Sequence, residues 1–290
     1  MTINKIMNDF ETAVSGVKDG STILVSGFGG AGMPTELLNA LRDQGATDLT
    51  IVSNNAGVGR EGIGGLLSDG KVKKVICSYP RSGGSVIFEE MWAAGKVELE
   101  VVPQGTLSER IRAAGAGIGA FYTPTGVGTQ LAEGKEVRKI NGRDQVLEYP
   151  LKGDVAFVLA KAADRWGNLI YNKSARNFGP VMAPAADLTV VQVHEIVELG
   201  ALDPEAIVTP SIFVDRVVQP AELEWDDVDL VDLIGLDIGY GLIPLVNTET
   251  GGQLLSRVKG VRKKLSAELG FLVQPIRIRD NLDLDPEIYH

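Results

Sequence analysis

Cysteine and histidine are nearly missing from this chain of 290 residues, which has one cysteine, Cys77, and two histidines, His194 and His290. A single cysteine excludes an intramolecular disulfide. So few thiol and imidazole groups also argue against a metal site or a Cys–His catalytic pair, and we expect no bound metal. Cys77 follows the strand-like run 72–76, which favours a buried, inert thiol over a nucleophile because free cysteine is usually buried.

Positive charge and long apolar runs are also scarce. The 28 Lys and Arg residues face 38 Asp and Glu residues, for a net charge of −10. Nucleic-acid binding needs a basic surface that displaces counterions, so we expect no nucleic-acid partner. No apolar run approaches the roughly 20 residues of a membrane-spanning helix. The N-terminus lacks the basic-then-apolar pattern of a signal peptide. The sequence therefore predicts a cytoplasmic chain without a membrane span.

Glycine is abundant, and the 35 glycines gather in turns between apolar runs. Short β-branched runs alternate with helix-like stretches. The predicted strands are 22–26, 49–53, 72–77, 97–102, 154–160, 168–171 and 188–193, and the predicted helices are 34–44, 62–68 and 86–94. Strands and helices that alternate in this way form crossover units. We therefore predict an α/β fold with an open, mainly parallel sheet and helices on both faces.

Three local signals add detail to this pattern. Pro34 suits a first helical position, where its missing N–H costs nothing. The run 106–109, Thr-Leu-Ser-Glu, is typical of a capping box that opens another helix. Asn141 and Gly142 stand between two alternating runs within 136–148, which predicts a β-hairpin.

The character of the chain changes after Pro220. An acidic, linker-like stretch spans 222–227, Gly270 suits a helix C-cap, and 275–279 is strand-like. Apolar residues at helical spacing lie between them: Leu254, Val258, Val261, Leu265 and Leu269. These features predict a short C-terminal α+β piece.

The loop 27–32 contains Gly-x-Gly-x-x-Gly between a predicted strand and a predicted helix, the context of a dinucleotide site. Such a site needs an acidic residue at the end of the second strand, where Ser53, Asn54 and Asn55 stand instead. Two other interpretations remain. The glycines either only permit positive φ in a turn, or the loop presents backbone N–H groups to a ligand oxygen at a helix N-terminus.

Five blocks of sequence carry a resemblance to one enzyme family. They are 19–34, 51–57, 102–107, 121–126 and 173–178. In these blocks, in this order, and up to about Gln219, the chain resembles the A-type subunit of the family I CoA-transferases. One departure is Ser26, where the family usually has glycine. The resemblance implies the α/β fold shared with ribose-5-phosphate isomerase and glucosamine-6-phosphate deaminase.

The resemblance also implies a reaction. The runs 77–81 and 164–169 look closest to the 3-oxoadipate branch of the family, with the acetoacetate (3-oxoacid) enzymes next. The implied enzyme moves CoA from succinyl-CoA to a 3-oxo acid. A carboxylate attacks the thioester, and an acyl anhydride and then a glutamyl thioester form on the enzyme. We expect a CoA thioester as substrate and no permanently bound cofactor.

The attacking glutamate of the family lies in a Ser-Glu-Asn-Gly type motif of a B subunit. This chain has no such motif, because its candidate carboxylates stand in other contexts: Glu36, Glu61, Glu109 and Glu195. The resemblance therefore implies a hetero-oligomer in which a separate B subunit supplies the glutamate. We expect the chain alone to be inactive.

Two side chains have roles by resemblance. Gln104 would place its amide against the thioester carbonyl and stabilise the oxyanion, which is worth about 3 kcal/mol of barrier. The alternative is a polar turn residue after a strand. Arg176 would hold a substrate carboxylate, which a guanidinium matches in a bidentate way. The alternative for Arg176 is a structural ion pair.

Four further residues would line the same pocket by resemblance. Gly29 and Gly30 would contribute backbone groups, and Asn54 and Asn55 would contribute side chains. For the two asparagines, capping of a turn is an equal alternative to contact with a ligand.

From about residue 225 the chain resembles the start of the cytoplasmic region of FlhA, the flagellar type III export-gate protein. The segments that carry this resemblance are 236–246, 251–255, 257–265 and 276–282. We therefore expect two domains, a CoA-transferase domain of the A-subunit type over 1–222 and an FlhA-like fragment over 226–290, with a seam at 221–225. The joining fits a natural or an engineered fusion.

The fusion leaves two functions open. The chain is either an enzyme subunit that carries a passenger, or a fusion whose 226–290 fragment is an interaction module for export-apparatus partners, with the transferase half as its carrier.

Overall fold

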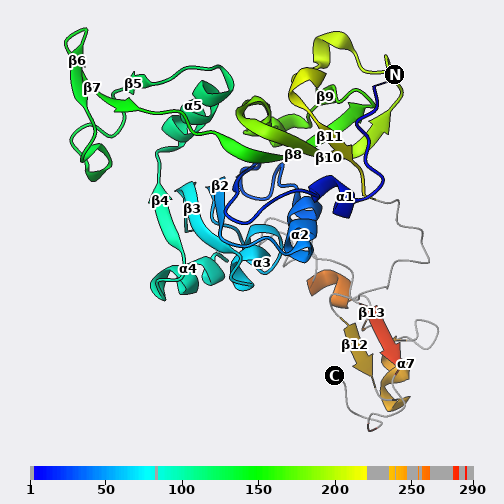
Figure 1. Cartoon of the computed structure of the whole chain (residues 1–290). Coiled ribbons are helices and arrows are strands. Elements are labelled where there is room, and N and C mark those ends of the chain that lie inside the picture. The colour runs from blue at the N-terminus through cyan, green and yellow to red at the C-terminus, as the bar shows by residue number, and fades with distance from the viewer. Residues whose placement is uncertain are drawn as a thin grey trace. The chain divides into compact units, whose positions relative to one another are not determined.

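The computed structural model describes residues 3–81, 84–220, 235–238, 240–246, 254, 257–261, 277–280 and 285. The chain divides into two compact units, Met1–Ala221 and Glu222–His290 (Figure 1). The first unit contains a large sheet covered by helices. The described part of the second contains a short pair of parallel strands.

The sheet of the first unit has eight strands in the order β11-β10-β8-β1-β2-β3-β4, with β9 paired to β8. The strands are β1 (Thr22–Val25), β2 (Leu49–Asn55), β3 (Val72–Tyr79), β4 (Glu98–Val101), β8 (Gly153–Asp164), β9 (Leu169–Ile170), β10 (Ala186–Val197) and β11 (Arg216–Val218). Neighbours along the main path pair in parallel, whereas β9 is antiparallel to β8. The predicted open, mainly parallel sheet is confirmed.

Helices cover both faces of this sheet. They are α1 (Phe10–Val14), α2 (Thr35–Gln44), α3 (Gly62–Ser68), α4 (Val86–Ala93), α5 (Gln104–Gly115) and α6 (Gly179–Met182), with short 3₁₀ segments η2 (Lys173–Arg176), η3 (Ala183–Ala185), η4 (Pro204–Ala206) and η5 (Ser211–Phe213). Side chains alternate along a strand. Ile23 of β1 therefore packs in the core beneath α1–α4, and Leu24 packs in the core beneath α5 and α6.

A small antiparallel sheet stands apart from the main sheet, in the order β5-β7-β6. Its strands are β5 (Phe121–Thr123), β6 (Val137–Ile140) and β7 (Arg143–Glu148), and η1 (Gln130–Ala132) lies between β5 and β6. Asn141 and Gly142 form the turn with φ of 51° and 78°. Positive φ at both positions is the geometry that an Asn-Gly hairpin adopts. The predicted hairpin is confirmed.

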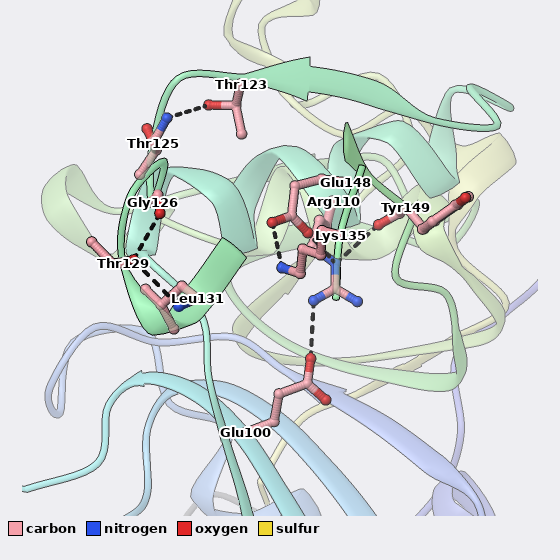
Figure 2. Close-up of polar contacts among 10 residues, drawn as sticks. All are labelled: Glu100, Arg110, Thr123, Thr125, Gly126, Thr129, Leu131, Lys135, Glu148 and Tyr149. Atoms are coloured by element: carbon pink, nitrogen blue, oxygen red, sulfur yellow. Dashed lines mark hydrogen bonds and ion pairs between the residues drawn. The ribbon is translucent and has the colours of Figure 1, made fainter. Parts of the chain in front are cut away.

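Arg110 of α5 connects this small sheet to the main sheet (Figure 2). Its Nη1 lies 3.0 Å from Glu100 Oε1 of β4, and its Nε donates to the Tyr149 carbonyl at 2.9 Å. Glu148 of β7 is buried and accepts from Lys135 Nζ at 2.6 Å, with Arg110 Nε 4.0 Å away. Charges of alternating sign therefore run from the edge of the main sheet into the small one.

The first residues of the chain lie along the outer edge of β11. Met7 N donates to the Val217 carbonyl at 2.7 Å, and Val217 N donates to the Lys5 carbonyl at 2.8 Å. The Arg216 guanidinium adds hydrogen bonds to backbone carbonyls at the end of α1. Residues 5–7 therefore cover the outer edge of β11, the edge strand of the main sheet.

The helix starts predicted from Pro34 and from the capping box at 106–109 are wrong, whereas the starts predicted at 62 and 86 match those of α3 and α4. Pro34 is the N-cap of α2, with φ of −83° and ψ of 71°, and the helix begins at Thr35. The predicted capping box at 106–109 lies inside α5, which begins at Gln104 directly after Pro103. Thr106 is buried, and its Oγ1 has no hydrogen-bond partner in the described part of the chain. No side chain caps this helix start, and Leu107 and Ile111 of the helix are buried in the core.

The described part of the second unit contains β12 (Gly235–Ile238), η7 (Tyr240–Leu242), α7 (Ile243–Val246) and β13 (Arg277–Asp280). β12 and β13 pair in parallel, and Leu254 and 257–261 are helical. Several predicted features lie outside the described residues: the seam at 221–225, the acidic stretch 222–227, and Leu265, Leu269 and Gly270. In the described part of the chain, no helix is both long and apolar enough to cross a bilayer.

Candidate functional site

The carboxyl ends of β1, β2, β3 and β4 open onto one edge of the sheet, because these strands are parallel neighbours. In open α/β sheets this edge is where ligands bind. Gly29 and Gly30 lie in the loop after β1, Asn54 and Asn55 are the last residues of β2, and Gln104 begins α5 shortly after β4. The structure therefore brings five of the six predicted site residues to one edge.

Ser26 closes the glycine loop. Its hydroxyl donates to the Gly32 carbonyl at 2.7 Å and accepts from Leu159 N of β8 at 3.1 Å. Gly27, Gly29 and Gly32 have φ of 125°, 60° and 82°, values that favour glycine. Glycine is therefore needed for the shape of this turn, in addition to any role in binding.

Asn177 holds the same loop from outside. Its Oδ1 accepts from Gly27 N at 3.1 Å, and its Nδ2 donates to the Ala31 carbonyl at 2.9 Å. A Cβ at Gly32 would lie 2.7 Å from the Ala175 carbonyl oxygen. η2 and Asn177, which follows it, therefore pack directly on the loop. No sequence signal singled out Asn177, although it lies in the block 173–178.

The two asparagines have different partners. Asn55 Oδ1 accepts from Gly57 N at 2.9 Å, which caps the turn, and its Nδ2 lies 3.5 Å from the Gly29 carbonyl. Asn54 Oδ1 accepts from Gln104 Nε2 at 2.6 Å and from Ser78 Oγ at 2.8 Å. Asn55 therefore shapes the loops, whereas Asn54 contacts Gln104.

A cavity of about 430 Å³ opens between these loops. It is lined by Phe28, Gly29, Asn54, Asn55, Val58, Ser78, Tyr79 and Gln104, none of which is charged. A second cavity of about 240 Å³ shares Phe28 and Gln104, and a third of about 170 Å³ contains Gly30 and Glu61. The walls of the cavity of about 430 Å³ therefore offer neutral amide and hydroxyl groups beside exposed apolar side chains. Sequence analysis missed Phe28, Val58, Ser78 and Tyr79 as lining residues.

Arg176 is the sixth predicted site residue, and it stands apart from these cavities. It is exposed at the end of η2 and lines none of the three. It forms no ion pair with any residue that the structure describes. Its neighbour Asn177 lines the cavity of about 240 Å³, so Arg176 is adjacent in sequence to a lining residue. Its guanidinium has no ion-pair partner among the described residues.

Cys77 is buried in β3, and burial raises the pKa of its thiol to about 12. A thiol with that pKa is protonated near neutral pH and is a poor nucleophile. The predicted burial of Cys77 is therefore confirmed, and its inertness stays a prediction. Within the described ranges, no group of three or more His, Cys, Asp or Glu side chains is placed to hold a metal ion.

Comparison with known proteins identifies the family of the chain. Residues 7–220 match the family model described as coenzyme A transferase. The chain belongs to the coenzyme A transferase family. This transferase chain is 61% identical to the A subunit of the 3-oxoadipate CoA-transferase of Pseudomonas putida, over 74% of this chain and 94% of the relative. It is 50% identical to the A subunit of the probable succinyl-CoA:3-ketoacid coenzyme A transferase of Bacillus subtilis, over 77% and 92%.

Solved structures of transferases share the fold. The acyl-CoA transferase YdiF of Escherichia coli O157:H7, solved as a thioester complex with CoA, matches with a TM-score of 0.65 and 24% identity, over 76% of this chain and 48% of that chain. Glutaconate coenzyme A-transferase of Acidaminococcus fermentans matches with a TM-score of 0.63 and 22% identity, over 74% and 75%. These matches confirm the α/β transferase fold.

A second family model, described as FHIPEP, matches residues 204–290 of this transferase chain. This match fits the predicted resemblance of the C-terminal part to the flagellar export-gate protein. Both family models cover 204–220. In the structure this stretch forms η4, η5 and β11, and β11 belongs to the main sheet. The shared stretch is therefore part of the first unit.

Proposed function

We propose that this chain is the A-type half of a CoA-transferase that moves CoA from succinyl-CoA to a 3-oxo acid. The observation that carries the proposal is 61% identity with the A-type half of a 3-oxoadipate CoA-transferase, over 94% of that relative. Identity with the corresponding half of a succinyl-CoA:3-ketoacid enzyme is lower, at 50%. We therefore favour 3-oxoadipate as the acceptor, with acetoacetate next. A CoA thioester as substrate, no resident cofactor and a cytoplasmic location belong to the same proposal.

The attacking carboxylate comes from a separate B subunit in this proposal. The cavity between the loops is lined by neutral residues, and the chain's candidate glutamates are engaged elsewhere or lie outside it. Glu36 accepts from Gln192, and Glu109 pairs with Arg112 at 2.6 Å. Glu61 lines only the smaller cavity beside Gly30. The cavity is suited to receive a carboxylate that this chain does not supply.

Gln104 stabilises the thioester carbonyl as it gains negative charge. A glutamine amide has two N–H donors, and one of them is used by Asn54. The second N–H is available to an oxyanion in the cavity, where a fixed donor is worth about 3 kcal/mol of barrier. Gly29 borders the same cavity through its backbone, and Gly30 borders the cavity of about 170 Å³ that shares Gly29 with it. Arg176 is proposed to hold the acceptor's carboxylate.

The test of this proposal is reconstitution. The purified chain is mixed with succinyl-CoA and 3-oxoadipate or acetoacetate, with and without a B subunit, and acyl-CoA formation is followed. We expect no transfer from the chain alone, transfer on adding the B subunit, and a higher kcat/KM for 3-oxoadipate. Robust transfer by the chain alone would contradict the proposed division of labour.

Two variants of the assembled enzyme locate the chemistry. Gln104→Ala is expected to lower kcat by roughly 100-fold or more with a much smaller change in KM, because the donor acts in the transition state. Glu61→Gln is the matched control for an internal carboxylate and is expected to keep most of the activity. Loss of activity in Glu61→Gln with an unchanged rate in Gln104→Ala would reverse these assignments.

A second candidate function rests on the FHIPEP match. We propose a transferase domain over 1–222 and an FlhA-like fragment over 226–290, which is a candidate interaction module for export-apparatus proteins. Binding of a flagellar export partner is measured for the full chain and for a chain ending at residue 222. Binding by the full chain alone supports the module, and equal binding by both assigns the contact to the transferase domain.

A further inference from the structure

We propose that Ser78 is a positioning residue for Gln104, acting through the side chain of Asn54. The inference rests on the proposed function, because it concerns how the Gln104 amide is held ready for the thioester. The three side chains come from three neighbouring elements, at the ends of β2 and β3 and at the start of α5. The order β2-β3-β4 places them side by side.

Asn54 is the centre of this contact. Its side chain is buried, and its Oδ1 accepts from both Gln104 Nε2 at 2.6 Å and Ser78 Oγ at 2.8 Å. Ser78 Oγ also lies 3.1 Å from the Asn54 carbonyl oxygen. One hydroxyl therefore contacts the backbone and the side chain of Asn54 together. The hydroxyl has one proton to donate, and its donation to Oδ1 favours the orientation in which Oδ1 faces Gln104.

The strand register explains why Ser78 can do this. β2 and β3 pair in parallel with Ser53 opposite Cys77 and Asn55 opposite Tyr79. Asn54 and Ser78 lie between these two pairs, and side chains so placed on neighbouring strands project to one face and interact. The contact is therefore built into the sheet and is not an incidental contact between loops.

The fixed amide matters because Gln104 is exposed at the first position of α5. A glutamine side chain without a partner would sample several rotamers. The bond to Asn54 uses one N–H and holds the second in one direction, toward the cavity that Gln104 lines. A donor that is already oriented needs no rearrangement when the oxyanion forms.

The neighbouring strand offers a matched control. Ser53 of β2 is fully buried, and its Oγ has no hydrogen-bond partner in the described part of the chain. Ser53→Ala and Ser78→Ala remove the same atom from adjacent strands. Only the second removes a hydroxyl that orients Asn54.

The kinetic test uses the enzyme assembled with its B subunit. Ser78→Ala is expected to lower kcat about tenfold and to change KM by no more than about twofold, because it removes one orienting hydrogen bond. Ser78→Thr keeps the hydroxyl and is expected to keep most of kcat. Ser53→Ala is expected to leave kcat unchanged. In a Gln104→Ala background, Ser78→Ala is expected to add nothing. A further tenfold loss in that background, or an unchanged kcat in Ser78→Ala, would overturn the inference.

A second measurement needs no catalysis. The side-chain amide signals of Gln104, assigned by their loss in Gln104→Ala, are followed by NMR in the full chain. Ser78→Ala is expected to shift them and to speed their hydrogen exchange, and Ser53→Ala is expected to leave them in place. Unchanged signals in Ser78→Ala would refute the positioning role. Failure of the reconstituted wild-type enzyme to transfer CoA counts against the proposed function instead.

Discussion

Removal of the Ser26 hydroxyl is expected to destabilise the first unit, because this one atom links three parts of the fold. Ser26 is fully buried at the end of β1. Its hydroxyl donates to the Gly32 carbonyl and accepts from Leu159 N of β8. Ser26→Ala leaves a carbonyl and an N–H without their partner, and the alanine methyl group can replace neither bond.

The expected size follows from these two bonds. A neutral hydrogen bond contributes about 1 kcal/mol net, and a buried group left unsatisfied costs about 1–3 kcal/mol. Gly32 is buried and Leu159 partly so, which places the loss of unfolding free energy at about 2–3 kcal/mol. For a unit of this size, 1 kcal/mol shifts the thermal midpoint by about 2–4 °C. The midpoint should therefore fall by about 4–12 °C.

The assay is differential scanning calorimetry of the full chain, with Ser53→Ala as the control. Ser53→Ala deletes a buried oxygen that has no hydrogen-bond partner among the described residues, so it should be neutral or slightly stabilising. Equal midpoints for the two variants would refute the reasoning. The result also bears on the glycine that the family usually carries at this position, which cannot make either bond.

Three other outcomes are expected. Gly32→Ala places a Cβ 2.7 Å from a backbone carbonyl at a φ of 82°, so it should lower the thermal midpoint and transfer activity together. Cys77 should resist iodoacetamide at pH 8 until urea unfolds the chain, since a pKa of about 12 leaves only about one thiolate in ten thousand. Although burial raises the pKa of Glu100, hydrogen bonds from Lys74 and Arg110 outweigh it and lower the pKa below its ordinary value of 4.5. Its contribution to stability is therefore present above about pH 4.5 and lost as the pH falls further, so Glu100→Gln should flatten the acid limb of a stability–pH curve.

Seven of the eight strands of the main sheet were predictable from their β-branched runs between turns, as at 22–26 and 72–77, whereas β11 was not predicted. The Asn141-Gly142 turn was predictable for a similar local reason, since only a few residue pairs accept positive φ twice. The start of α5 was not, because no side chain caps it and Leu107 of the helix is buried in the core with residues of distant strands. Local sequence signals therefore predicted the elements whose backbone conformation is set by residues nearby in the chain.

The candidate site was likewise only partly predictable from the sequence. Family resemblance indicated Gln104 and Asn54, but nothing in the sequence indicated that they share a hydrogen bond. That contact depends on the order of β2, β3 and β4 in the sheet. The same holds for Asn177, which reaches Gly27 across 150 residues. Contacts of this kind become visible only when the chain is folded.

The edge strand β11 has a mechanical consequence. The first unit ends at Ala221, shortly after this strand, so tension on the C-terminal part would reach Val218 before the rest of β11. β11 is paired in parallel with β10 and with the residues around Ile6, which include Lys5 and Met7. Tension along the strand axis loads these hydrogen bonds in shear, all at once, and does not unzip them one by one. The last strand of the first unit is thus held on both of its sides, by β10 and by the residues around Ile6.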